Sequence, residues 1–180
     1  MIRCRMSLTP NDLSTSAAQL IAGYVPGAIA RIVELHSLYY AQGFGLGLAF
    51  EARLAIELSS FLLNLDPNSD ALIIATVSGV IVGSITVDGR TLGPTEAQLR
   101  WFVVDSNHSE VASALMREAL EFCRAKNFRR VLISTVVSSP LAETLTKDWG
   151  FSLIHQNTGH QWDRPVEEQI LQLALTRNAP

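Results

Sequence analysis

The spacing of apolar and polar residues changes character along the chain. Apolar side chains recur at helical intervals in residues 27–41, 49–64 and, most clearly, 109–126. Short apolar runs bounded by turn residues are typical of strands. The strands expected from these runs are 18–25, 71–77, 80–88, 97–105, 129–137, 151–156 and 167–175, with one more helix at 139–150.

Glycine and proline mark the ends of several of these elements. The Ser78-Gly79 dipeptide between two apolar runs is typical of a two-residue hairpin turn. Pro140 suits the first turn of a helix, and Gly150 suits a helix C-terminus. The resulting order, β-α-α-β-β-β-α-β-α-β-β, predicts an α/β fold with a single mixed, mostly antiparallel sheet flanked by helices.

Length and composition narrow the class of protein. A chain of 180 residues suits one domain, and we expect residues 1–20 to be an N-terminal lead-in and 21–180 to form that domain. The formal net charge of −3 gives no general attraction to nucleic acid or to an anionic membrane surface. No run of about 18 apolar residues occurs, so we expect no membrane span.

The cysteine and histidine positions argue against disulfides and metals. Cys4 and Cys123 are too few and too far apart for a disulfide framework or a zinc site. The N-terminal residues lack the apolar core of a signal peptide. We therefore expect a reducing cytoplasm. His155, His160 and Trp162 have no spacing typical of a metal site, so no metal is expected.

Six stretches of the sequence, taken in order, resemble the GNAT superfamily of acetyltransferases. They are GAIARIVELHSLYY, FEARLA, VSGVIVGSI, LRWFVVD, LMREALEFCRAKNFRRVLIST and WGFSLI, and together they extend over about residues 27–175. The chain looks most similar to the GNAT domains that follow a MarR-type DNA-binding domain, although we expect no such DNA-binding domain here. The resemblance implies the GNAT, or acyl-CoA N-acyltransferase, fold.

The resemblance also implies where acetyl-CoA binds. The coenzyme would lie between the strand ending at Val103 and Val104 and the strand that begins near Arg130. Its pantetheine amides would pair with the first strand, and its pyrophosphate would rest on the amides of the following turn and helix. The residues implied for coenzyme binding are Phe102, Val103, Val104, His108, Ser109, Glu110, Val111, Ala112, Ser113 and Ala114.

The turn before the long helix departs from the family pattern. The family carries Q/R-x-x-G-x-G/A there, whereas SNHSEVASA has no glycine, lysine or arginine and is two residues shorter. Asn107 and Glu110 instead predict a capping box, and Glu110 would place a negative charge beside the phosphates, at a cost on the order of 1 kcal/mol when exposed. Two interpretations follow: an ordinary capped helix with a degenerate pyrophosphate loop, or a weaker or shifted phosphate site.

Candidate catalytic groups are few, and each has a structural alternative. Thr146 occupies the region where the family often has a tyrosine that protonates the leaving thiolate, but threonine is a poor acid. Glu51 could reach the acceptor amine, or it could only stabilise the first turn of its helix. Glu96 could be a base or a solvated loop acid. His36 could be a base or a packed side chain.

Two functions are consistent with these observations. The first is an acetyl-CoA-dependent N-acetyltransferase that acts on a small-molecule or peptide amine. The second is a binding or regulatory module on the same fold that has lost normal acetyl-CoA binding. In either case we expect neither a nucleic acid nor a membrane as partner, and the apolar helix pair in 27–64 offers a surface for a homodimer.

Overall fold

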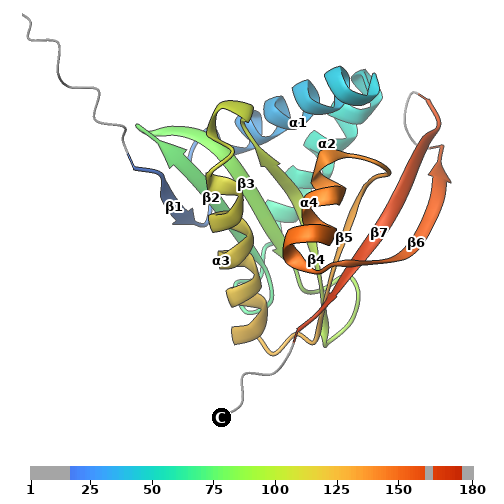
Figure 1. Ribbon diagram of the computed structural model, residues 1–180. Helices are drawn as coiled ribbons and strands as arrows, with labels where there is room; N and C mark the ends of the chain where they lie inside the picture. Colours follow the sequence, from blue (N-terminus) through green and yellow to red (C-terminus); the bar gives the residue numbers. More distant parts are fainter. Residues whose placement is uncertain (1–16, 161–163, 176–180) are drawn as a thin grey trace, which may run out of the picture.

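The computed structural model describes residues 17–160 and 164–175, which form one twisted sheet with helices on both faces (Figure 1). In chain order the elements are β1 (Gln19–Ala22), α1 (Ala28–Phe44), α2 (Leu48–Leu63), β2 (Ala71–Val77), β3 (Val80–Asp88), β4 (Glu96–Val104), the 3-10 turn η1 (Ser106–His108), α3 (Val111–Ala125), β5 (Arg130–Val136), α4 (Pro140–Trp149), β6 (Ser152–Gly159) and β7 (Val166–Ala174). The spatial order is β1-β2-β3-β4-β5-β7-β6. Only β4 and β5 pair in parallel, so the predicted mixed, mostly antiparallel sheet is confirmed. Cys4 and Trp162 lie outside the described residues.

Two apolar cores hold the helices to the sheet. The core under α3 and α4 includes Leu115, Met116 and Leu145, each fully buried. The core under α1 and α2 includes Ile32 and Leu58, also fully buried. Burying one such side chain contributes about 1.5–3 kcal/mol. Helices α1 and α3 thereby contact β4, and α4 contacts β5, in the middle of the sheet.

The turn chemistry predicted from glycine and proline is confirmed. Ser78 and Gly79 both have positive φ, 51° and 78°, as a type I′ hairpin turn requires. The Ser139 hydroxyl accepts a hydrogen bond from the Ala142 amide at 3.1 Å and so caps α4. Gly150 ends that helix with a φ of 74°.

The two parallel strands at the centre of the sheet separate partway along their length. Pairing between β4 and β5 ends at Leu99 and Ile133. Beyond that point β4 stays with β3 as far as Val104, while β5 stays with β7 as far as Val136. The edge of β4 that faces β5 therefore has no strand partner from Arg100 onward.

A bulge in β4 lies just beyond this separation. The register between β3 and β4 shifts between Ser84 and Thr86, so that β4 has one extra residue there, and Trp101 has a φ of 48°. Leu99 before the bulge and Val104 after it both pack on the core under α3, although they are five residues apart. Regular alternation would place them on opposite faces, so the bulge changes which side chains face which helices.

Candidate active site

Two cavities adjoin at the point where β4 and β5 separate. The first, which we call the α3-side cavity, has a volume of about 210 Å³ and is lined by residues of α1, β4, α3 and α4. The second, the α2-side cavity, has a volume of about 300 Å³ and is lined by residues of α1, α2, β4, β5 and β7. Tyr40, Phe102 and Leu141 line both cavities. A molecule in one cavity would therefore meet a molecule in the other at these three side chains.

The α3-side cavity contains half of the residues that the sequence implied for coenzyme binding. Phe102, Val103 and Val104 line it from β4, and Ala112 and Ser113 line it from the first turn of α3. The five others lie outside this lining. They are His108, Ser109 and Glu110 in the turn before α3, Val111, which is buried in the core, and Ala114.

The capping box predicted at the start of α3 is wrong. Asp105, rather than Asn107, is the capping side chain, and it accepts a hydrogen bond from the Asn107 amide at 3.0 Å to start the 3-10 turn. Helix α3 begins later, at Val111, with Glu110 as its N-cap residue and no capping side chain. Aspartate competes for this position because its carboxylate binds a backbone amide two residues on. The first-turn amides of α3 are thus not occupied by a side chain.

Charges near the start of α3 are held by neighbouring side chains. The Glu110 carboxylate is 66% exposed and lies 3.5 Å from His108 Nδ1, so it has room to turn toward solvent. Arg31 of α1 lies 3.0 Å from the Asp105 carboxylate and also bonds the Ile81 carbonyl. The Asn107 amide hydrogen bond is the main cause of the lowered pKa of Asp105.

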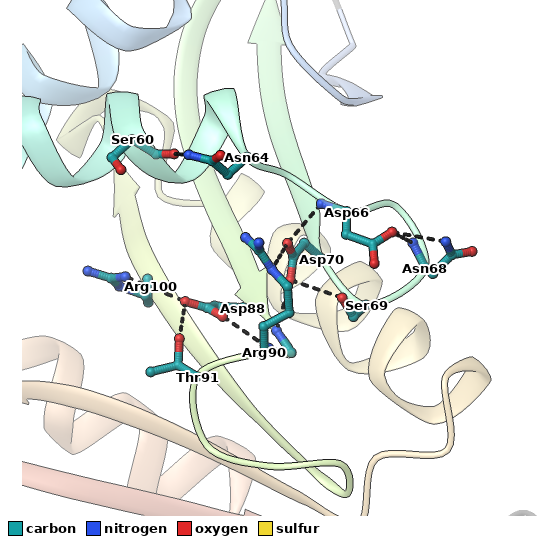
Figure 2. Close-up of polar contacts among 11 residues, drawn as sticks. Ser60, Asn64, Asp66, Asn68, Ser69, Asp70, Asp88, Arg90, Thr91 and Arg100 are labelled. Atoms are coloured by element: carbon teal, nitrogen blue, oxygen red, sulfur yellow. Dashed lines mark hydrogen bonds and ion pairs between the residues drawn. The ribbon is translucent and has the colours of Figure 1, made fainter.

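Ionic contacts line one side of the α2-side cavity. Glu57 of α2 binds two cations: Arg53 Nε at 2.9 Å and an Arg100 Nη atom at 2.7 Å. The other Arg100 Nη atom lies 3.5 Å from Asp88, and the guanidinium lies 4.2 Å from the Trp101 ring centre. Figure 2 shows Asp88 at the junction of β3 and its loop, facing Arg100. These contacts fix Arg100 in one position at the cavity wall.

A second carboxylate, that of Asp70, lies just before β2 and lines neither cavity. Its side chain is fully buried and accepts hydrogen bonds from the amides of Asp66 and Gly89 at 2.9 and 3.1 Å. Arg90 Nε lies 2.6 Å from it, as Figure 2 shows. Because every contact joins loop residues to the end of β2 or β3, this cluster holds the loops rather than a ligand.

Two aromatic residues of α1 lie at the inner end of the α2-side cavity. His36 is 4% exposed, and its Nδ1 donates a hydrogen bond to the Ile32 carbonyl at 2.8 Å. Burial lowers the pKa of His36 to about 4, so the ring is neutral near neutral pH. Burial also raises the pKa of Tyr40 to about 12, and the Thr135 side chain offsets part of that rise. The packed interpretation of His36 is thus supported by its environment.

Three of the four residues considered as catalytic candidates, Glu51, Glu96 and Thr146, line neither cavity. Glu51 is exposed in the first turn of α2. Glu96 forms an ion pair with Arg130 at the end of β4 where the sheet is still paired. Thr146 is exposed, and its hydroxyl donates to the carbonyls of Ala142 and Glu143 of its own helix. Their catalytic roles remain predictions.

Sequence reasoning missed the polar residues that do line the α2-side cavity. They are Tyr40, Arg53, Glu57, Gln98, Arg100, Ser134, Thr135 and Glu168. A signal existed for some of them: Arg53 and Glu57 have the i,i+4 spacing of a helical ion pair, and Arg100 interrupts an apolar strand. Within residues 17–160 and 164–175 no helix is long and apolar enough to cross a membrane. The same part of the chain has no group of three or more side chains suited to a metal ion.

The central strands β4 and β5 separate, α3 begins beside the gap, and two cavities adjoin there. This arrangement is typical of a class of protein that holds two molecules end to end. The comparisons with known proteins specify this class. Residues 29–151 match the acetyltransferase (GNAT) family, and the chain belongs to that family.

Similar proteins include two human N-acetyltransferases. N-acetyltransferase 8B and N-acetyltransferase 8 are each 33% identical over 88 residues, which is 48% of this chain and 39% of each relative. The match thus spans about two fifths of the length of these curated relatives. Among solved structures, ribosomal-protein-alanine N-acetyltransferase from Brucella melitensis has a TM-score of 0.67 at 15% identity, covering 86% of this chain and 99% of its own. A putative acetyltransferase from Salmonella typhimurium, solved with acetyl-CoA, has a TM-score of 0.63 at 15% identity, covering 90% and 97%. These two structures support the fold.

Proposed function

We propose that this protein is an acetyl-CoA-dependent N-acetyltransferase that transfers the acetyl group to an amine of a small molecule or a peptide. The observation that carries the proposal is the adjoining pair of cavities where β4 and β5 separate. Acetyl-CoA would occupy the α3-side cavity and the acceptor the α2-side cavity. The thioester would then lie at Tyr40, Phe102 and Leu141, which line both.

The α3-side cavity fits a coenzyme of this chemistry. The unpaired edge of β4 beyond Leu99 offers backbone donors and acceptors to the pantetheine amides. Phe102, Leu141 and Trp149 offer apolar surface to its methylene groups. The first turn of α3 has no capping side chain, although its Ala112 amide donates to the Ser109 carbonyl at 3.2 Å, and the helix dipole favours an anion there. Acetyl-CoA, when bound, would supply the acetyl group activated as a thioester.

The α2-side cavity suits an amine acceptor. An alkyl amine is protonated near neutral pH and must lose a proton before it attacks. Glu168 lies in this cavity and close enough to Tyr40 to raise its pKa, although burial is the larger cause. The Glu168 carboxylate is therefore placed to bind the amine and accept its proton. Holding both reactants in adjoining cavities supplies the rest of the rate enhancement.

The alternative, a module that has lost the coenzyme, drew support from the altered turn before α3, with its predicted capping box, and from Thr146 in place of a tyrosine. The support from the capping box falls away because Glu110 makes no capping hydrogen bond at the start of α3. The absence of glycine and the presence of the Glu110 charge then predict weaker coenzyme binding rather than none.

Calorimetric titration with acetyl-CoA tests the proposal directly. We expect micromolar binding, lost in Ser113→Glu, which adds a negative charge beside the first-turn amides of α3. Ser152→Glu is the matched control, because it adds the same charge on exposed β6. A panel of amines, read by release of the free thiol, would follow. Absence of binding at millimolar acetyl-CoA would refute the proposal.

A further inference from the structure

A chain of hydroxyl groups leads from the start of α4 toward Tyr40. The Ala142 amide donates to Ser139 Oγ at 3.1 Å, and Ser139 Oγ lies 3.1 Å from Thr135 Oγ1. Thr135 and Tyr40 both line the α2-side cavity, and the Thr135 side chain lowers the pKa of the Tyr40 hydroxyl, against the larger rise caused by burial. Ser139 and Thr135 are 1% and 5% exposed, so neither hydroxyl exchanges its partner with bulk water.

The hydrogens of this chain fit best in one direction. Ser139 Oγ already accepts from Ala142, and its own hydrogen is satisfied only if it donates to Thr135. The Thr135 hydroxyl is then free to donate to Tyr40, whose pKa it lowers, and the Tyr40 hydrogen remains available. The opposite direction would leave a buried Ser139 hydrogen without an acceptor among the described residues, which is costly. Each bond polarises the next, and the positive end of α4 adds to the effect.

The Tyr40 hydroxyl therefore offers a donor at the place where the two cavities meet. Tyr40 lines both cavities, and its ring is fixed by Phe50 at 4.7 Å and by Tyr39 at 5.1 Å between ring centres. Thr146, by contrast, gives its hydroxyl hydrogen to carbonyls of its own helix. A donor for the reacting centre thus comes from α1 and not from α4.

We propose that Tyr40 is a catalytic residue whose hydroxyl donates a hydrogen bond to the departing sulfur of coenzyme A, with Thr135 and Ser139 as positioning residues that polarise it. The proposal rests on the acetyltransferase function proposed above. The amine nitrogen bonds to the acetyl carbonyl carbon, and the carbon–sulfur bond breaks with its electron pair passing to sulfur. The ammonium loses one proton to the Glu168 carboxylate, which passes it to solvent before the attack, and the nitrogen loses its second proton to the same carboxylate as the carbon–sulfur bond breaks. The thiolate, held by Tyr40, takes a proton from water on release.

Tyr40 acts here as a hydrogen-bond donor that keeps its proton. Burial holds its pKa at about 12, whereas an alkyl thiol has a pKa of roughly 8.5. Full transfer of the phenolic proton to the thiolate would be unfavourable, but a hydrogen bond to a charged sulfur is strong. The charged or titratable groups that share the α2-side cavity are His36, Arg53, Glu57, Arg100 and Glu168.

The affinity of free coenzyme A for the protein tests the hydrogen bond without an acceptor. Its thiol becomes a thiolate as the pH rises from about 7 to about 9.5. In the wild type, coenzyme A should bind about tenfold more tightly at the higher pH, relative to desulfo-coenzyme A, because a charge-assisted bond forms. Desulfo-coenzyme A lacks the sulfur. The ratio of the two affinities at each pH therefore removes the effect of protein groups whose titration changes the binding of both ligands equally.

Variants assign the effect to Tyr40. Tyr40→Phe keeps the ring and should abolish the tenfold preference, whereas Tyr24→Phe, at a 59% exposed site, should retain it. Thr135→Val should reduce the preference and Thr135→Ser should restore it. With the best acceptor of the amine panel, Tyr40→Phe should lower kcat about tenfold or more and leave KM for acetyl-CoA unchanged.

The outcomes separate the two proposals. If the wild type binds neither coenzyme A nor acetyl-CoA, the acetyltransferase function itself is refuted. If it binds both and Tyr40→Phe retains the preference for the thiolate, or keeps the wild-type kcat, the role of Tyr40 is refuted while the function stands.

Discussion

The neutral, buried His36 predicts a specific loss of stability in mild acid. Its side chain is 4% exposed, and its Nδ1 donates to the Ile32 carbonyl, which requires a hydrogen on that nitrogen only. Burial lowers its pKa from 6.5 to about 4 in the folded protein. A proton that binds the unfolded chain readily therefore binds the folded chain poorly.

The sign and the size of the effect follow from this difference. Between the two pKa values the unfolded chain carries more protons, so the free energy of unfolding falls as the pH falls. The contribution of His36 is intact above a pH of roughly 6.5 and is lost progressively toward the folded pKa. About 2 kcal/mol should be lost between pH 7 and pH 5, and on the order of 3 kcal/mol in the limit of low pH.

Urea denaturation at these two pH values measures the effect. The difference between the wild type and His36→Gln isolates this residue, because the variant lacks the titrating ring while other groups titrate in both proteins. His155→Gln is the matched control, since His155 is exposed on β6, and it should lose as much stability as the wild type. Equal losses in the wild type and in His36→Gln would refute the reasoning.

Two further predictions concern charged side chains, that of Glu110 before α3 and that of the buried Asp70 before β2. Glu110→Gln should raise the affinity for acetyl-CoA several-fold in calorimetry, and more at low salt, because it removes a negative charge from the N-cap position of α3; an unchanged affinity would place the phosphates elsewhere. Asp70→Asn should lower the free energy of unfolding by about 2–4 kcal/mol, because an amide cannot replace a buried carboxylate that accepts from Gly89 and Asp66 and pairs with Arg90. A loss below about 0.5 kcal/mol in urea denaturation would contradict that account.

The fold was predictable because local signals agreed with one another. The apolar stripe of α3 and the positive-φ turn at Ser78 and Gly79 act over a few residues, and the structure confirms both. The cap of α3 was predicted wrongly because the Asp105 carboxylate accepts hydrogen bonds from both the backbone amide and the side-chain amide of Asn107, which starts a 3-10 turn instead. Sequence alone could not rank those two side chains.

The α2-side cavity could not be predicted because its residues come from separate elements. Tyr40, Glu57, Arg100 and Glu168 belong to α1, α2, β4 and β7, and they meet only when both helices pack on the sheet. The spacing of these four residues along the sequence gives no sign that they lie close together in the fold. The α3-side cavity was easier, since the residues of β4 and the first turn of α3 that line it are neighbours in sequence.

The bulge at Trp101 sets limits on how this sequence can vary. Because it shifts the alternation of side chains, the two halves of β4 are out of phase, with Leu99 and Val104 directed at the same core. Exchanging either residue for another apolar side chain would alter volume alone. Deleting one residue at the bulge would restore strict alternation and turn one half of the strand to the wrong face. In this strand, the number of residues is therefore constrained more tightly than their identity.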